Sequence, residues 1–217
     1  RQGVRAQIPQ ESLARNKRRS ERSSRCAARA ALDLKGGKSL QPYPSQQHPI
    51  PNVPQPPLHT VPCFKADNLP ASKHGEFERQ LKGQQDGLNR LTVEEFLENV
   101  VNPKERDPKV ARNARRKLYD DLRRRAYDEL SKGMSRVEAK KLSAKQAKET
   151  MSSLAALHNP DLIAGGRDVI ADFGDRQVNS TIGPQWKSRV GELIQSVKKQ
   201  SKEDGVSGFL NVRLHKC

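Results

Sequence analysis

Apolar residues recur with helical spacing along most of the chain beyond residue 76. In the longest series, over residues 108–132, apolar side chains stand four positions apart at Val110, Ala114, Leu118, Leu122, Ala126 and Leu130. Pro108 suits the first position of a helix, and Gly133 suits the position just after its end. The pattern therefore predicts one long helix with a narrow buried face.

Two capping boxes predict further helices. Thr92 and Glu95 form the first box, which opens a short helix that ends before Pro103. The second box spans residues 135–138 and opens a helix that we expect to continue to Leu157. Its buried side carries Leu142, Ala147, Met151 and Leu154. Together with the long helix, these boxes indicate a mainly helical domain.

The last part of the chain predicts one more helix, which begins at Gly183 and Pro184. The apolar residues of this predicted helix recur at the spacing of one buried face; they are Trp186, Val190, Leu193, Ile194 and Val197. The helical spacing of Trp186 with other apolar residues favours a core position over a surface on which bases stack. Residues 209–214 alternate apolar and polar, which predicts a short terminal strand or an extended tail.

The first 62 residues lack these patterns. Residues 42–62 contain eight of the fourteen prolines, which disfavour helix and central strand, so we expect a spacer there. Residues 1–41 are rich in Lys and Arg, and we expect a basic arm or a linker helix. Only 33% of the residues are hydrophobic, against a usual ~45–50%. The predicted fold is mainly α: a compact helical domain over residues 63–217, preceded by a basic, proline-rich, partly disordered N-terminal region.

The chain is strongly basic, with a net charge of +16 from 41 Lys and Arg against 25 Asp and Glu. A chain of this charge usually binds a polyanion or an acidic protein. Residues 104–148 contain sixteen Lys and Arg against seven acids, so the predicted helices there offer phosphate contacts. The candidate nucleic-acid-binding residues are Arg115, Arg116, Arg123 and Arg124. A solvated helix face with ion pairs four residues apart is the alternative.

The three cysteines, Cys26, Cys63 and Cys217, are widely spaced and form no CxxC motif. This spacing indicates neither a thiolate zinc site nor a disulfide framework, and it fits a reducing cytosol. We expect no transmembrane helix and no signal peptide, because no apolar run is long enough and no N-terminal signal pattern is present. The chain opens at Arg1 rather than at Met, so we expect it to be a piece of a longer polypeptide.

One segment differs from the basic chain around it: residues 157–175 contain four aspartates and a histidine. His158 continues the buried face of the preceding predicted helix, and Pro160 disfavours helix at Asn159. We therefore expect Asn159 to cap a new turn that has Asp161 in its first positions. Such a corner can aim His158 and Asp161 into one pocket. A hydrogen-bonded structural histidine and an aspartate that only complements a helix dipole are the alternative.

The remaining aspartates of this segment predict a metal site. Asp168, Asp172 and Asp175 have the spacing of one helix face, where carboxylates repel one another by about 0.2–0.5 kcal/mol per pair. A divalent cation would relieve that repulsion, and so would Arg167 or Arg176. Oxygen ligands favour Mg²⁺ or Mn²⁺ over structural zinc.

Several motifs in this region resemble a known family. The stretches LHNPDLIAGG (157–166) and FGDRQVNSTIGPQW (173–186) resemble the polymorphic toxin type 15 domain, and residues 79–100 resemble its leading part. The hallmark of that family is His-x-x-Asp, which His158 and Asp161 match. The resemblance spans roughly residues 63–214. It implies a compact helical nuclease domain of a type VI secretion effector, a metal-dependent endonuclease that degrades DNA in a rival bacterial cell.

The resemblance also implies that His158 and Asp161 form the catalytic centre. A histidine titrates near neutral pH and suits the general base that activates water, while Asp161 suits metal binding or orientation of the imidazole. Supporting candidates are Arg167, for the charge of the scissile phosphate, and Asn179, for positioning a water or a substrate oxygen. The candidate metal ligands, for Mg²⁺ or Mn²⁺, are Asp161, Asp168, Asp172 and Asp175.

DNA and a cognate immunity protein are the implied partners. Because the chain is basic, we expect an acidic immunity protein, bound over or beside residues 158–179. Its expected contacts are Arg167, Arg176, Lys187 and Arg189. The N-terminal region is expected to contact a secretion apparatus or a chaperone, so that the toxin is injected from the producer and acts in the target-cell cytoplasm. An RNase toxin and a non-enzymatic nucleic-acid-binding module are the alternatives.

Overall fold

The computed structural model describes residues 56–203 and 208–217. The predicted basic arm and residues 42–55 of the predicted spacer lie outside the described residues. The described part contains six α-helices, which confirms the mainly helical fold class. In chain order its elements are β1 (His59–Thr60), the 3₁₀ turn η2 (Ala71–Lys73), α2 (His74–Leu88), α3 (Val93–Val101), α4 (Pro108–Leu130), α5 (Arg136–Ser153), β2 (Leu154–Leu157), η3 (Leu162–Ala164), β3 (Asp172–Asp175), α6 (Arg176–Ile182), η4 (Gly183–Ser188), α7 (Val190–Glu203) and β4 (Val212–Arg213).

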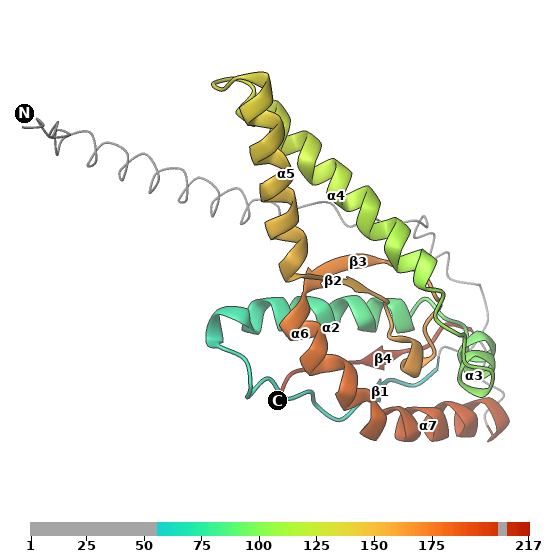
Figure 1. Ribbon diagram of the computed structural model, residues 1–217. Helices are drawn as coiled ribbons and strands as arrows, with labels where there is room; N and C mark the ends of the chain where they lie inside the picture. Colours follow the sequence, from blue (N-terminus) through green and yellow to red (C-terminus); the bar gives the residue numbers. More distant parts are fainter. Residues whose placement is uncertain (1–55, 204–207) are drawn as a thin grey trace, which may run out of the picture. The chain divides into compact units, whose positions relative to one another are not determined.

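The core is built by α2, α3, η3, α6, η4 and α7 together with the segment that follows β1 and the segment around β4 (Figure 1). Trp186 is fully buried in this core, as predicted. Its indole Nε1 donates to Oε1 of Gln84 on α2 at 2.6 Å, and its ring lies edge-on to Phe64 with centroids 5.1 Å apart. Other large side chains that are fully buried are Phe77, Leu88, Leu91, Phe96, Ile182 and Leu193. Among the described helices, none is both long enough and apolar enough to cross a membrane.

The beginning and the end of this fold lie side by side. Strands β1 and β4 pair in parallel, with His59 opposite Val212. Residues 56–62 of the proline-rich segment therefore belong to the folded unit, and a strand forms within the predicted terminal segment 209–214. A disulfide joins Cys63 to Cys217 just beyond the paired strands. The expectation that the cysteines remain unpaired was wrong, because strand pairing brings together two residues that are 154 positions apart in sequence.

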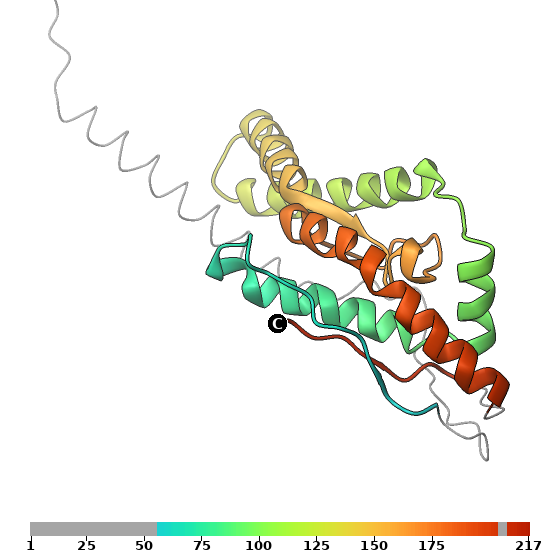
Figure 2. The same ribbon diagram turned by 90° about the horizontal axis from the view of Figure 1, so that it is seen from below.

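Helices α4 and α5 form an antiparallel hairpin that projects away from the main core in Figure 1 and recedes behind it in the view of Figure 2. The core cluster contains no residue of either helix, and within α4 only Leu122 is buried. The N-cap of each predicted capping box is confirmed. Thr92 Oγ1 accepts from the Glu95 amide at 3.1 Å, and Ser135 Oγ accepts from the Glu138 amide at 3.3 Å. Local sequence therefore sets where these helices begin.

The segment after α5 contradicts the prediction that this helix continues to Leu157. Residues 154–157 form β2, which pairs antiparallel with β3. At the end of α5, Arg115 of α4 donates to the carbonyl oxygens of Met151 (3.0 Å) and Leu154 (2.9 Å), so it binds backbone carbonyls where the helix gives way to the strand. Helical spacing of Leu and Ala was misleading here, because strand pairing overrides a modest local propensity.

The prediction that three aspartates share one helix face was also wrong. Asp172 and Asp175 are the ends of strand β3, and Asp168 lies in the loop before it. The predicted corner is shifted as well. Asp161 rather than Asn159 is the capping residue, because its carboxylate accepts from the Ile163 amide at 3.4 Å at the start of η3.

Candidate active site

His158 follows β2 directly, at the end of the β2–β3 pair. In that pair Leu157 stands opposite Asp172, and the carbonyl of Leu157 accepts from the Ala171 amide at 3.0 Å. The strand pair thus fixes the backbone just before the histidine. The His158 side chain is only 7% exposed.

The carboxylate that contacts the imidazole is that of Asp168, not that of Asp161. His158 Nε2 lies 2.8 Å from Asp168 Oδ1, and Asp168 Oδ2 accepts from the Asp107 amide at 2.6 Å. The Asp107 hydrogen bond, joined by the one from His158, holds the pKa of Asp168 below its ordinary value although burial opposes the charge. Asp168 is therefore an ionised acceptor at neutral pH.

Asp161 is held by backbone contacts near this pair. One carboxylate oxygen caps η3, and the Asp161 amide donates to Gln84 Oε1 at 3.4 Å. Because Gln84 Oε1 also accepts from the buried Trp186, the hallmark loop is tied directly to the core. The other oxygen of Asp161, Oδ2, lies toward Gly183 at the end of α6.

Three glycines allow the loop that carries the hallmark residues to lie against α2. A Cβ on Gly87 would overlap the carbonyl group of Asn159, and a Cβ on Gly83 would lie 2.8 Å from Nδ2 of the Asn159 side chain. A Cβ on Gly166 would overlap the carbonyl of Pro160. Close backbone approach at Gly87 and Gly166 requires glycine, whereas a side chain at Gly83 would meet only the Asn159 side chain.

The two supporting candidates lie in different surroundings. Arg167 makes a fork-like contact with Glu95 of α3, at 2.5 and 2.6 Å, so a carboxylate within the fold already balances its charge. Asn179 is half-buried on α6, and its carbonyl accepts from the Gly183 amide. Neither contact joins these residues to His158.

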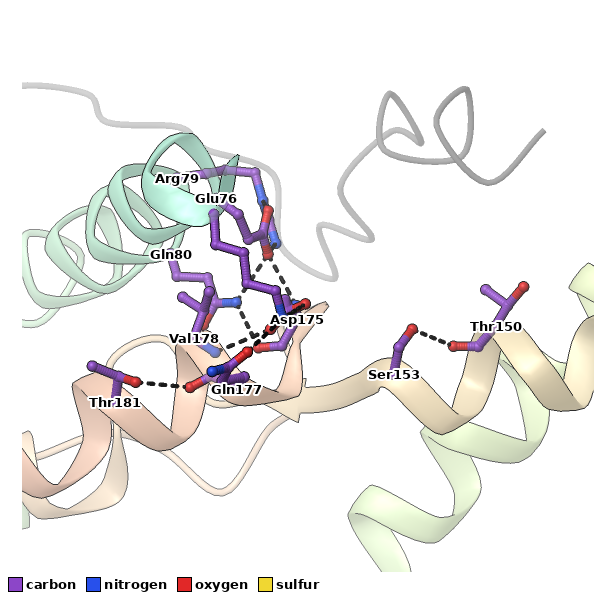
Figure 3. Close-up of polar contacts among 10 residues, drawn as sticks. Glu76, Arg79, Gln80, Thr150, Ser153, Asp175, Gln177, Val178 and Thr181 are labelled. Carbon is purple, nitrogen blue, oxygen red and sulfur yellow. Dashed lines mark hydrogen bonds and ion pairs between the residues drawn. The ribbon is translucent and has the colours of Figure 1, made fainter. Parts of the chain in front are cut away.

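A second polar cluster fastens α2 to the start of α6. Figure 3 shows Glu76, Arg79 and Gln80 directed from α2 toward Asp175. Glu76 Oε1 accepts from Gln80 Nε2 at 2.9 Å and from the Asp175 amide at 3.0 Å, and Arg79 binds the same carboxylate. Burial by itself would raise the pKa of Glu76, but the hydrogen bonds from Arg79 and Gln80 outweigh it and lower the pKa to about 2.

The other two predicted metal ligands belong to this second cluster. Asp172 is paired with Arg79. Asp175 caps α6 through the Val178 amide (3.1 Å) and forms an ion pair with Lys73 at 2.9 Å. Burial by itself would raise the pKa of Asp175, but the hydrogen bond and charge of Lys73, together with hydrogen bonds from the Val178 and Gln177 amides, lower that pKa below its ordinary value. Both carboxylates thus have cationic partners from the first part of the fold.

The predicted metal ligands do not form one set. Over residues 56–203 and 208–217, no group of three His, Cys, Asp or Glu side chains is placed to hold a metal ion. Asp168 binds His158, whereas Asp172 and Asp175 bind Arg79 and Lys73. The arrangement therefore does not fit a preformed centre of four aspartates.

The predicted phosphate-binding arginines of α4 differ in their availability. Arg115 is engaged by two carbonyl oxygens within the fold, as described above. Arg124 pairs with Asp121 at 2.7 Å, and Arg123 lies 3.9 Å from Asp120. Arg116 is exposed and forms no ion pair with any described residue. The set predicted from sequence therefore mixes structural and available cations.

Two further cations on α4 were missed. Lys109 and Arg112 are exposed and stand three and four positions apart in series with Arg116, which places all three on one helix face. This face lies opposite the apolar series that packs on α5. Helical spacing alone places these three cations on one face. It does not show that they are available, because that depends on which neighbouring arginines form ion pairs within the fold.

Sequence reasoning also missed Asp107 and Gln84. Asp107 precedes Pro108 and caps α4, with its carboxylate accepting from the Lys109 amide at 2.8 Å. An aspartate before a proline is a local signal for a cap, but its approach to Asp168 has no sequence signature. Gln84 carried no signal, because its role depends on Trp186 and Asp161 meeting it in space.

The comparison with known families covers this whole site. A family model described as Novel toxin 15 matches residues 71–215, which is more than half of the chain and includes His158, Asp161 and Asp168. No curated protein matches the chain. On the extent of the family match, this chain belongs to the Novel toxin 15 family and is a polymorphic toxin domain.

Proposed function

We propose that this toxin domain is a nuclease that hydrolyses phosphodiester bonds in the DNA of a target cell. The observation that carries the proposal is the contact of His158 with Asp168, at 2.8 Å, inside the matched family range. A histidine held by a carboxylate is a frequent arrangement of a general base. The net charge of +16 supports a polyanionic substrate.

The proposed chemistry divides the work between the hallmark residues. His158 takes the proton of the attacking water. Asp161 uses Oδ1 to cap η3, and Oδ2 is the oxygen that we assign to holding the water or the substrate. Arg167 and Asn179 remain supporting candidates for phosphate charge and substrate position. In this scheme Glu95 orients Arg167, so the guanidinium reaches a phosphate only at its remaining N–H groups.

Dependence on Mg²⁺ or Mn²⁺ is part of the proposal, although the four aspartates do not form a preformed ligand set. Asp161 is the only one of the four without a described cationic or imidazole partner, since its described contacts are to backbone amides and the Gln84 amide. A divalent ion would stabilise the charge on the phosphate and on the leaving oxygen.

The substrate surface that we propose is the outward face of α4. Lys109, Arg112 and Arg116 lie on the first two turns and beyond, close in sequence to Asp107, which contacts Asp168. Phosphates bound by these cations would therefore lead toward the histidine. Cations on a helix face bind the DNA backbone without reading its sequence, so we expect little sequence preference.

Incubation of plasmid DNA with the purified chain tests the proposal, in Mg²⁺, in Mn²⁺ and in EDTA. We expect nicked or linear plasmid with metal and intact plasmid in EDTA. Cleavage of RNA in EDTA, with intact DNA, would instead identify an RNase that uses the substrate's 2′-hydroxyl. If the chain retards DNA on a gel but does not cut it at any metal concentration, the domain binds nucleic acid without being an enzyme.

The partner that we propose is an acidic immunity protein that covers residues 158–179. We propose that only some of the four expected cations contact this partner. Arg189 donates to the Pro62 and Cys63 carbonyls and lies over the Phe64 ring, so it serves the fold. Arg176 and Lys187 are exposed and are the better candidates. Opposite charge would speed association.

Competition measures this contact. Labelled DNA is bound to the His158→Ala variant and titrated with the immunity protein. We expect the immunity protein to displace the DNA. With an Arg176→Glu/Lys187→Glu variant, a higher concentration of the immunity protein should be needed for the same displacement. Undiminished binding of both ligands at once would place the inhibitory contact elsewhere. Injection from a producer cell, through a secretion apparatus or chaperone that binds the N-terminal region, completes the proposed route to the target-cell cytoplasm.

A further inference from the structure

We propose that Asp168 is a positioning residue that fixes the imidazole of His158 with Nδ1 as the basic nitrogen. Asp168 lies ten positions after His158 and outside the His-x-x-Asp hallmark. Its carboxylate is the group that contacts the imidazole, at Nε2. In this proposal Asp168 acts only through His158, whereas Asp161 contacts the reacting water or substrate.

The choice of nitrogen follows from what each atom can donate. An ionised carboxylate has no proton to give, so the contact at 2.8 Å requires a hydrogen on His158 Nε2. In a neutral imidazole the other nitrogen, Nδ1, then carries the lone pair. Nδ1 is therefore the atom that accepts a proton from water.

The second oxygen of Asp168 strengthens this assignment. It accepts from the Asp107 amide at 2.6 Å, so both oxygens of the carboxylate receive a donor. Asp107 caps α4. The same side chain therefore holds the imidazole and the capping residue of the basic helix in one fixed relation.

This double contact makes a sharp prediction for Asp168→Asn. A carboxylate accepts from two donors, but an amide offers one acceptor oxygen and one donor nitrogen. The asparagine must either leave one donor unpaired or turn its NH₂ toward Nε2. In the second case the hydrogen of the imidazole moves to Nδ1, and the base is lost although every atom remains near its place.

Nuclear magnetic resonance of chain labelled with ¹⁵N at histidine tests the contact without any enzyme assay. His158 is assigned by the signal that disappears in His158→Ala. At alkaline pH we expect a protected, downfield Nε2–H signal and an unprotonated Nδ1 in the wild type. Asp168→Ala should lose the protected signal, and Asp67→Asn, an exposed aspartate, should retain it. A protected Nε2–H in Asp168→Ala, or a proton on Nδ1 in the wild type, would overturn the proposal.

The kinetic part of the test rests on the proposed nuclease function. Asp168→Asn should lower kcat for plasmid cleavage by about 10²–10⁴-fold, because the general base is lost when the imidazole hydrogen moves to Nδ1, with KM for DNA nearly unchanged. A rise in KM as large as the fall in kcat would indicate that Asp168 contacts the substrate instead. Absence of cleavage by the wild type would refute the nuclease and leave the resonance test to decide the role of Asp168.

Discussion

Gly87 and Asn159 lie so close together that a Cβ on Gly87 would overlap the carbonyl group of Asn159. The two residues come from α2 and from the loop that carries His158 and Asp161. This backbone contact sets how near the hallmark loop comes to the core. The position of the candidate active site therefore depends on the absence of a side chain in a distant helix.

Gly87→Ala is expected to displace the hallmark loop. The new methyl group meets backbone rather than a flexible side chain, so we expect a loss of about 1–3 kcal/mol in the free energy of unfolding, measured by urea titration. Gly75→Ala is the matched control on the same helix, because nothing lies within 4 Å of its Cβ position. It should be neutral or stabilising by about 0.5–1 kcal/mol. Equal effects of the two changes would show that the close approach is unimportant.

His158→Ala and Asp161→Ala are each expected to remove most plasmid cleavage. A positioned acid–base group typically contributes about 10²–10⁴-fold to rate. Circular dichroism should remain that of the wild type, since each change leaves the main core intact. His74→Ala and Asp67→Ala are the controls and should cleave normally. A double variant with a normal spectrum and wild-type cleavage would refute the assignment of the hallmark.

Replacement of Lys109, Arg112 and Arg116 by Gln should flatten the salt dependence of DNA binding. Each lost phosphate contact reduces the slope of log K against log salt by ~0.9. Fluorescence anisotropy on the His158→Ala background measures the slope without cleavage. The control removes three exposed cations outside the hairpin, namely Lys65, Lys82 and Arg90. If the slope falls equally in both triple variants, DNA binding depends on the net charge of the chain and not on this face of α4.

Glu76 predicts an acid-sensitive contribution to stability. Its pKa is lowered from 4.5 to about 2 in the folded chain, so the folded state favours the ionised carboxylate. The contribution is complete above the unfolded pKa and is lost as pH falls from about 5 to about 2, with an upper bound of about 3 kcal/mol. Urea titrations across this range should show less pH dependence for Glu76→Gln than for Glu78→Gln, whose exposed side chain lies on the same helix. The same pH dependence in both variants would contradict the prediction.

The Cys63–Cys217 disulfide is expected to stabilise the fold by about 2–4 kcal/mol, because it restricts the unfolded chain. Dithiothreitol should lower the urea midpoint of the wild type. The Cys63→Ser/Cys217→Ser variant should already have the lower midpoint and should not respond to reductant. A wild-type midpoint that is insensitive to reductant would mean that the bond contributes nothing to stability.

Features that depend on a few neighbouring residues were predictable from sequence. The caps at Thr92 and Ser135 are confirmed because a capping box joins groups three positions apart. The long helix follows because its apolar series repeats over six turns, and Trp186 is buried because its apolar neighbours recur at helical spacing. The family motif likewise placed His158 and Asp161 in one short segment.

Features that depend on contacts between distant segments could not be predicted from the sequence. Residues 154–157 have side chains that suit a helix, and only pairing with β3 makes them a strand. The nearest carboxylate to His158 in sequence is Asp161, yet the imidazole meets Asp168, because the loop returns past β2. Cys63 and Cys217 meet through paired strands.

The sequence by itself thus determined the helical class, the start of each capped helix and the segment that carries the hallmark, since local hydrogen bonding and side-chain periodicity decide these. The tertiary structure alone decided which carboxylate holds His158 and which cations of α4 remain available. It also decided that the four aspartates separate into two clusters. The physical reason is that a charged group takes the nearest partner in space, and spatial distance is set by how glycine contacts, strand pairing and the core bring distant segments together.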